Sequence, residues 1–225
     1  MEILKSLLDF ILHLDKHLFD LILNYGIWIY AILFLIIFVE TGLVVMPLLP
    51  GDSLLFAAGT FCAGVVNESG DKVQLNLWLV LILLIVAAIL GDGLNYFFGK
   101  TIGLKVLSWK IKGRQIVKQK YIDQTHAFYE KHGPKTIIIA RFVPIVRTFA
   151  PFVAGIGEMS YAKFIRFNII GGVAWVIGLT LMGYFFGNLE FVQKNFETVI
   201  FGIIGLSILP MIIEIIRAKL KRKSS

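Results

Sequence analysis

The sequence predicts an all-α integral membrane protein, because of its apolar content, the length of its apolar runs and the placement of its positive charges. Of the 225 residues, 57% are apolar and only 16% are charged. The apolar residues form long runs instead of alternating with polar ones, which is typical of helices surrounded by lipid. The long uncharged runs occupy residues 27–39, 75–90, 169–186 and 199–213.

The net charge of +7 is concentrated in two segments. Residues 100–135 hold nine Lys and Arg against Asp123 and Glu130, and residues 217–223 hold five with no acid. Basic segments beside apolar spans are typical of cytoplasmic loops and tails. We therefore place both segments in the cytoplasm and expect no nucleic-acid partner.

Residues 1–25 are expected to form an amphipathic helix that lies along the membrane interface, with a first transmembrane span as the alternative. His13 and His17 are one helical turn apart, but no third metal ligand is near them. Cys62 is the single cysteine, so the chain has neither an internal disulfide nor a multi-cysteine metal site. The apolar stripe of the helix is Leu4, Leu7, Leu8, Ile11, Leu14, Leu18, Leu21 and Ile22.

Residues 27–66 are expected to form a helical hairpin, which is a helix, a break and a second helix. Two prolines and a glycine within five positions interrupt any helix. Asp52 and Ser53 are good N-cap residues for a helix that restarts at Leu54. Glu40 and Asp52 then lie on either side of the break. The break residues are Pro47, Pro50 and Gly51.

Residues 75–99 form the next predicted transmembrane helix, and Asp92 is an acid near its end. Residues 100–135 follow as the basic cytoplasmic loop. This loop contains short helical patterns and Trp109, which are expected to lie on anionic headgroups.

Residues 136–158 are an apolar stretch that contains two arginines and two prolines. Arg141 and Arg147 would each cost a few kcal/mol at the bilayer centre, so each needs a partner or a water-filled cavity. Pro144 and Pro151 are expected to break the helical hydrogen bonding. We therefore expect a second hairpin here.

The remaining elements are a transmembrane helix at residues 160–187, a C-terminal transmembrane helix at 198–216 and a basic cytoplasmic tail at 217–225. Because the basic loop and the tail lie on the same side, an even number of crossings separates them. The two helices supply two crossings. Residues 136–158 must then enter and return on the same side, as a re-entrant hairpin.

The two halves of residues 26–187 follow the same order of elements. Each has a hairpin with two prolines and an Ala-Gly pair, followed by a helix that ends in the sequence YFFG, at 96–99 and 184–187. The fold class is therefore predicted as an inverted repeat of a re-entrant hairpin plus a transmembrane helix, which is a design of secondary transporters. Chance similarity between aromatic helix ends is the alternative.

The chemistry of the site follows from the charges beside the helix breaks. Arginine stays charged and fits a phosphate group well, so Arg141 and Arg147 are expected to bind phosphate. Carboxylates in the membrane can bind and release protons or cations, and we assign this coupling role to Glu40, Asp52 and Asp92. A purely structural salt bridge is the alternative.

These residues resemble the bacterial DedA family, which is akin to the VTT (SNARE-associated) domain of eukaryotic lipid scramblases. The similarity runs from about Gly26 to Gly187. The residues that carry it are Glu40, Pro50 to Ser53, Gly133, Arg141 to Pro144, Arg147, Thr148, Ala154, Gly155, Met159 and Phe164.

The resemblance implies a multi-pass protein of the bacterial cytoplasmic membrane that depends on the proton-motive force and supports envelope integrity. Some members of the family recycle undecaprenyl phosphate across the membrane, so the resemblance implies this as one role. Glu40 and Asp52 match the essential acids of the family, and Arg141 and Arg147 match its essential arginines.

The leading functional hypothesis is a carrier or flippase for a phosphorylated lipid, with a polyprenyl phosphate and protons or cations as its partners. A proton or cation antiporter for small solutes is the alternative. An enzyme that acts on lipid phosphate is less favoured, because no histidine lies in either hairpin. We therefore expect no catalytic residue, no cofactor and no metal, and we leave a homo-oligomer open.

Overall fold

The computed structural model describes residues 14–43, 51–66, 72–108 and 119–187, together with a few short or isolated positions elsewhere. The predictions for residues 1–13, for Pro47 and Pro50, and for most of the C-terminal helix and the basic tail lie outside the described residues.

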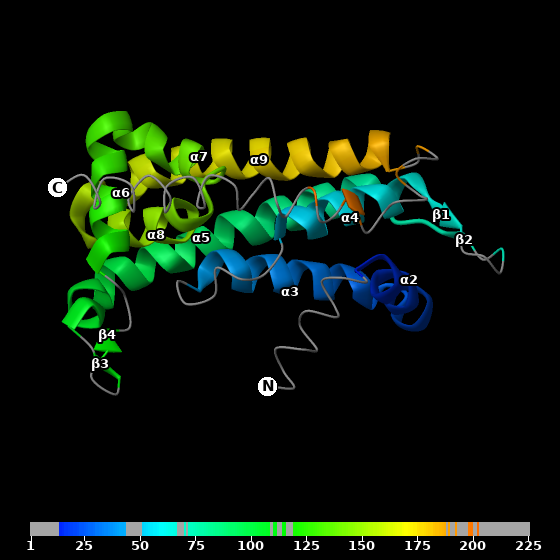
Figure 1. Cartoon of the computed structure of the whole chain (residues 1–225), viewed down its shortest axis with the longest axis horizontal. Coiled ribbons are helices and arrows are strands. Elements are labelled where there is room, and N and C mark those ends of the chain that lie inside the picture. The colour runs from blue at the N-terminus through cyan, green and yellow to red at the C-terminus, as the bar shows by residue number, and fades with distance from the viewer. Residues whose placement is uncertain are drawn as a thin grey trace, which may run out of the picture. The chain divides into compact units, whose positions relative to one another are not determined.

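The described residues are predominantly helical, as the sequence predicts (Figure 1). The helices are α2 (Leu14–Tyr25), α3 (Trp28–Gly42), α4 (Gly51–Ala63), α5 (Leu77–Ser108), α6 (Gln119–His132), α7 (Thr136–Ala140), α8 (Pro144–Val153) and α9 (Tyr161–Phe186). A 3-10 turn, η1 (Gly133–Lys135), precedes α7, and a π-helical segment, η2 (Ala154–Glu158), follows α8.

The described part of the chain also contains two short strand pairs, which the sequence analysis did not predict. Strand β1 (Val65–Val66) pairs antiparallel with β2 (Lys72–Val73), so that Val65 lies opposite Val73. Strand β3 (Lys110–Ile111) pairs in the same way with β4 (Arg114–Gln115).

Among the described residues, two helices are long and apolar enough to cross a membrane, namely residues 77–103 of α5 and all of α9. Large apolar side chains are exposed along both, among them Trp78 and Ile82 on α5 and Ile170 and Phe185 on α9. Exposed apolar surface of this extent is stable in lipid and unfavourable in water. The boundaries agree with the predicted spans, except that α5 continues to Ser108, into the predicted loop.

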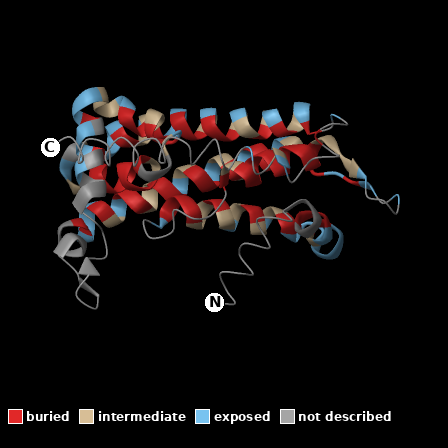
Figure 2. Ribbon diagram, viewed as in Figure 1, coloured by how far each residue is buried: buried red, intermediate tan, exposed pale blue. Residues whose placement is uncertain are grey.

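The chain forms two compact units. Unit 1 comprises Met1–Ile37, Pro50–Val86 and Trp175–Leu206, and unit 2 comprises Phe38–Leu49, Ala87–Ala174 and Ser207–Ser225. The helices α3, α5 and α9 contribute residues to both units. In unit 1, α4 is buried along almost its whole length (Figure 2).

In unit 1, α4 lies directly against α9, because glycines remove the side chains that would separate them. A Cβ atom at Gly59 would collide with the carbonyl group of Thr180, and one at Gly183 would collide with that of Phe56. Thr60 donates a hydrogen bond to the carbonyl oxygen of Gly183 across the contact (3.3 Å). Close backbone approach at small residues is typical of helix packing in membranes.

In unit 2, the same kind of contact joins α5 to α8 and η2. A Cβ atom at Gly99 would collide with the carbonyl group of Phe152, and one at Gly155 would collide with that of Tyr96. The Tyr96 hydroxyl also donates a hydrogen bond to the carbonyl oxygen of Met159 (3.0 Å), which follows η2.

The two contacts use positions with constant offsets between the halves of the chain. Gly155 lies 96 residues after Gly59 in the hairpins. Gly183 lies 84 residues after Gly99 in the long helices. The YFFG repeat pairs Gly99 with Gly187 instead. That pairing differs by one helical turn from the pairing that the glycine contacts give.

The break expected in residues 136–158 lies at residues 141–143, between α7 and α8. Val143 has an extended backbone (φ −124°, ψ 103°), and Pro144 is the first residue of α8. The residue before a proline is driven out of the helical conformation, while proline itself fits the first helical turn. Pro151 does not break the chain as expected, because α8 continues through it to Val153.

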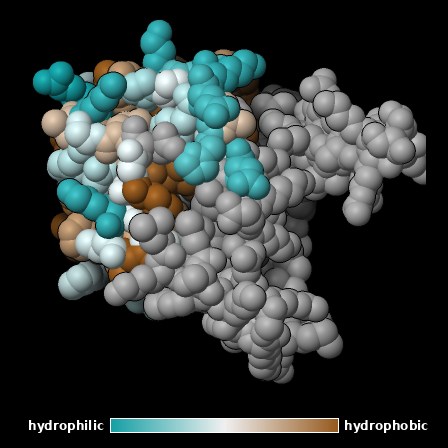
Figure 3. Space-filling model, turned by 90° about the vertical axis from the view of Figure 1, so that its left-hand side faces the viewer, coloured by the Kyte–Doolittle hydropathy of each residue, from teal (hydrophilic) through white to brown (hydrophobic). Residues whose placement is uncertain are grey.

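Helix α6 lies within the predicted basic loop and packs against α8. The buried Tyr129 hydroxyl donates a hydrogen bond to the carbonyl oxygen of Ala150 (2.9 Å). The face that carries α6 presents many hydrophilic residues (Figure 3). This agrees with a helix that borders water.

The glycine contact in unit 2 makes a prediction about stability. Replacing Gly99 with Ala should lower the free energy of unfolding by about 1–3 kcal/mol, because the new methyl group meets the Phe152 backbone. Gly93→Ala, on the same helix, is the matched control, since a Cβ atom there meets nothing within 4 Å. Thermal unfolding in detergent measures both variants. Equal stability of the two would contradict the packing described here.

Candidate functional site

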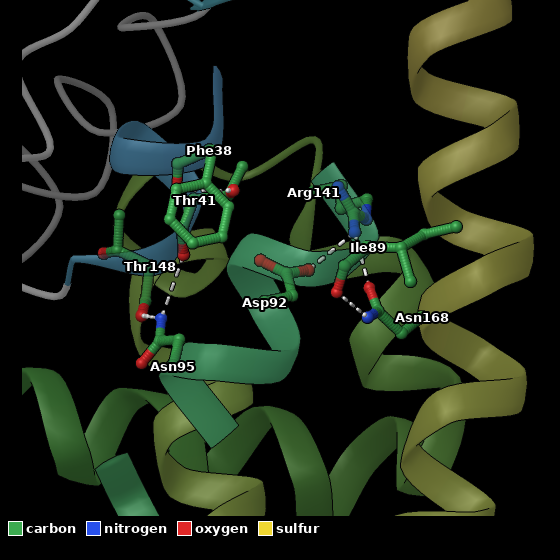
Figure 4. Close-up of polar contacts among 8 residues, drawn as sticks. All are labelled: Phe38, Thr41, Ile89, Asp92, Asn95, Arg141, Thr148 and Asn168. Atoms are coloured by element: carbon green, nitrogen blue, oxygen red, sulfur yellow. Dashed lines mark hydrogen bonds and ion pairs between the residues drawn. The ribbon is translucent and has the colours of Figure 1, made fainter. Parts of the chain in front are cut away.

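Arg141 lies at the end of α7 with its side chain inside unit 2. Its Nη2 atom donates hydrogen bonds to Oδ2 of Asp92 on α5 and to Oδ1 of Asn168 on α9, both at 2.6 Å (Figure 4). The side chains of Arg141 and Asp92 are only 2% and 5% exposed. This is a buried ion pair with an additional amide partner.

Asn168 is held in the orientation that Arg141 requires. Its Nδ2 atom donates a hydrogen bond to the carbonyl oxygen of Ile89 on α5 (3.0 Å), which turns Oδ1 toward the guanidinium group (Figure 4). Ile89 lies one helical turn before Asp92, so α5 contributes both to the ion pair and to its support. Sequence analysis did not single out Asn168, although a polar residue in an apolar span was a usable signal.

Two adjacent glycines of α9 make room for the Arg141 side chain. A Cβ atom at Gly171 would lie 3.1 Å from Nε of Arg141, and one at Gly172 would lie 3.4 Å from Nη2. The guanidinium group therefore lies against bare helix backbone. Sequence analysis did not identify this space beside Gly171 and Gly172.

Arg147 forms the second ion pair of unit 2. Its Nη2 atom lies 2.7 Å from Oε1 of Glu40, near the end of α3. The Arg147 side chain is 11% exposed, whereas that of Glu40 is 2% exposed. Arg147 lies in the first turn of α8, where its positive charge is unfavourable to the helix dipole, and Glu40 offsets this.

The two arginines differ in burial. The side chain of Arg141 is 2% exposed and lies against Gly171 and Gly172, whereas that of Arg147 is 11% exposed. In unit 2, Glu40 and Asp92, two of the three acids to which the sequence analysis assigned a coupling role, lie against the two arginines.

Asp52 lies in unit 1, where its Oδ1 atom accepts a hydrogen bond from Nε1 of the buried Trp175 (2.9 Å). Helix α4 begins at Gly51, three residues before the expected start at Leu54. Asp52 therefore lies in the first turn instead of capping it, where its negative charge suits the helix dipole. The coupling role assigned to Asp52 stays a prediction, and Trp175 carried no sequence signal.

Among the described residues, no three His, Cys, Asp or Glu side chains lie together as a metal site requires.

Comparison with known proteins places these residues in a known family. The VTT domain family model matches residues 49–185. The chain is 54% identical over 219 residues to Protein DedA of Escherichia coli K12, covering 97% of this chain and 96% of that protein. It is 44% identical over 178 residues to an uncharacterized membrane protein of Mycobacterium leprae (79% and 75% covered).

A third relative is Inner membrane protein YqjA of Escherichia coli K12, which is 35% identical over 162 residues (71% and 68% covered). No solved structure matches the chain. Asp92, Arg141, Arg147 and Asn168 all fall inside the matched domain.

The buried ion pair between Arg141 and Asp92 leads to a prediction about stability. Asp92→Leu should lower the free energy of unfolding by about 3–5 kcal/mol, because it leaves the Arg141 charge buried without its carboxylate. The double variant Asp92→Leu/Arg141→Met removes both charges and should recover most of that loss. Thermal unfolding in nanodiscs compares the two. A double variant no more stable than Asp92→Leu would contradict the described pairing.

Proposed function

Because this chain belongs to the DedA family of VTT-domain membrane proteins, we propose that it carries a phosphorylated lipid of the polyprenyl phosphate class across the bacterial cytoplasmic membrane, coupled to protons. The observation that carries this proposal is the short ion pair between the partly exposed Arg147 and the buried Glu40. A phosphate group can replace the Glu40 carboxylate on Arg147, since both are anions that fit a guanidinium group.

Arg147 is the arginine that exchanges partners in this proposal. Breaking a buried pair leaves an uncompensated charge, so exchange is easiest where the arginine is less enclosed. Arg141 keeps Asp92 and Asn168 and adds positive potential to the site. Both arginines thus favour phosphate, but only Arg147 releases its carboxylate.

Proton coupling follows from charge balance at the same pair. When Glu40 takes up a proton, Arg147 loses its counterion and attracts the lipid phosphate. When the phosphate leaves, Glu40 gives up the proton and pairs with Arg147 again. We assign further coupling roles to Asp52, which is held by Trp175 in unit 1, and to Asp92.

The fold proposed for this carrier is an inverted repeat of two re-entrant hairpins, each followed by a transmembrane helix. Support comes from the constant offsets of the glycine contacts, by which α4 packs on α9 and α8 packs on α5. In such repeats the hairpins approach the midplane and alternate access between the two sides. The chain would then cross the membrane several times.

The proposal predicts a specific loss of transport in proteoliposomes. Arg147→Ala should slow the movement of undecaprenyl phosphate at least about tenfold, because the charged hydrogen bonds to phosphate are lost. Arg166→Ala, which removes an exposed arginine of α9, is the matched control and should move the lipid normally. The assay measures how much phosphate on the outer leaflet is open to an impermeant phosphatase.

The same experiment tests proton coupling with the variant Glu40→Gln. This variant should still bind the lipid but should lose the acceleration that a pH gradient gives to the wild type.

Undiminished transport by Arg147→Ala would overturn the arginine assignment. Movement of small solutes without lipid movement would favour the antiporter, and release of free phosphate without added phosphatase would favour an enzyme.

A further inference from the structure

Asn95 is a fully buried polar residue of α5 that belongs to neither ion pair. Its side chain is 0% exposed. Its Nδ2 atom donates hydrogen bonds to two backbone carbonyl oxygens, that of Thr41 at 3.3 Å and that of Thr148 at 2.9 Å (Figure 4). These two acceptors come from different helices, α3 and α8.

The two carbonyl groups belong to the residues that directly follow Glu40 and Arg147, which form the second ion pair of unit 2. Thr41 follows Glu40, and Thr148 follows Arg147. One amide group thus joins the backbone that carries the carboxylate to the backbone that carries the guanidinium. A side chain that merely filled space would have no need to bond these two carbonyl groups.

A second contact holds α3 at the same place on α5. A Cβ atom at Gly91, one helical turn before Asn95, would collide with the Thr41 side chain and approach the carbonyl oxygen of Phe38. The backbone of α3 therefore lies directly on α5. The amide of Asn95 then fixes where along α5 the two partner helices meet.

The chemistry of the amide suits this task. A primary amide nitrogen carries two N–H donors, so it can bond two carbonyl groups at once, which neither a carboxylate nor an apolar side chain can do. Burying an amide is unfavourable unless it is bonded. Among the described residues, Oδ1 of Asn95 has no hydrogen-bond partner. The hydrogen bonds of Asn95 therefore offset only part of the free-energy cost of burying its amide. This is expected for a group that is retained for a purpose other than stability.

We propose that Asn95 is a positioning residue that holds the backbones of Glu40 and Arg147 at ion-pair distance. It acts through the pair and does not touch the lipid. The inference concerns the pair on which the proposed function rests, but it is a statement about geometry and holds whatever the pair transports.

The test measures the reactivity of the Glu40 carboxyl group in the full-length protein in nanodiscs. The lipid-soluble reagent dicyclohexylcarbodiimide modifies protonated carboxyl groups in apolar surroundings, and peptide mass mapping separates Glu40 from Asp92. Asn95→Leu should raise the labelling of Glu40 at least about fivefold, because two hydrogen bonds that support the pair are lost. The labelling of Asp92 should stay at the wild-type level.

Asn168→Leu is the matched control, because Asn168 supports the other pair. It should raise the labelling of Asp92 and leave that of Glu40 unchanged. Asn95→Ala also removes both donors and adds no bulk, so it should behave as Asn95→Leu does. This second variant also decides the matter if Asn95→Leu does not fold.

Unchanged labelling of Glu40 in both Asn95 variants would overturn the inference. An equal rise in the labelling of Glu40 and Asp92 would also overturn the inference, because general loosening of the fold would raise both. The measurement does not require transport. If no lipid moves but the Asn95 effect is present, the proposed function fails alone; if lipid moves but the effect is absent, this inference fails alone.

Discussion

The need to neutralise two arginines inside an apolar fold governs unit 2. A guanidinium group away from water requires an opposite charge and further hydrogen bonds. Arg141 receives Asp92 and the oriented amide of Asn168, whereas Arg147 receives Glu40. These partners come from α3, α5 and α9, so the requirements of the arginines determine how the surrounding helices must be placed.

Helix α5 provides most of this placement. It presents Asp92 to one arginine and Asn95 to the backbones on either side of the other pair. Its glycines admit neighbouring helices so closely that a single methyl group at Gly91 or Gly99 would displace them. Because Asp92, Asn95 and these glycines lie within a few turns of one helix, the packing and the electrostatics of the site cannot be changed independently.

The sequence predicted the helices, the stretch with the two arginines and the acids available to neutralise them. The run of apolar residues is enough to locate α9, and the rule for residues before proline explains the break at Val143. The sequence did not predict which acid pairs with which arginine. That choice depends on helix rotation and on contacts between segments about 50 to 110 residues apart, which no local pattern encodes.

The YFFG repeat suggested one alignment of the two halves, whereas the glycine contacts pair positions one helical turn away. The bonding partners of Asn95 and Asn168 lie on other helices, so they become evident only when the neighbouring helices are in place.

The central claim is that Arg147 exchanges the Glu40 carboxylate for a lipid phosphate. The most direct test is solid-state NMR of dipolar coupling between the phosphorus of a polyprenyl phosphate and nitrogen-15 in the arginine side chains, with the protein in bilayers. The wild type should show coupling at a distance that a hydrogen-bonded phosphate requires, and Arg147→Gln should lose it. Coupling that persists unchanged in Arg147→Gln, or that is absent from a wild-type protein with bound lipid, would contradict the claim.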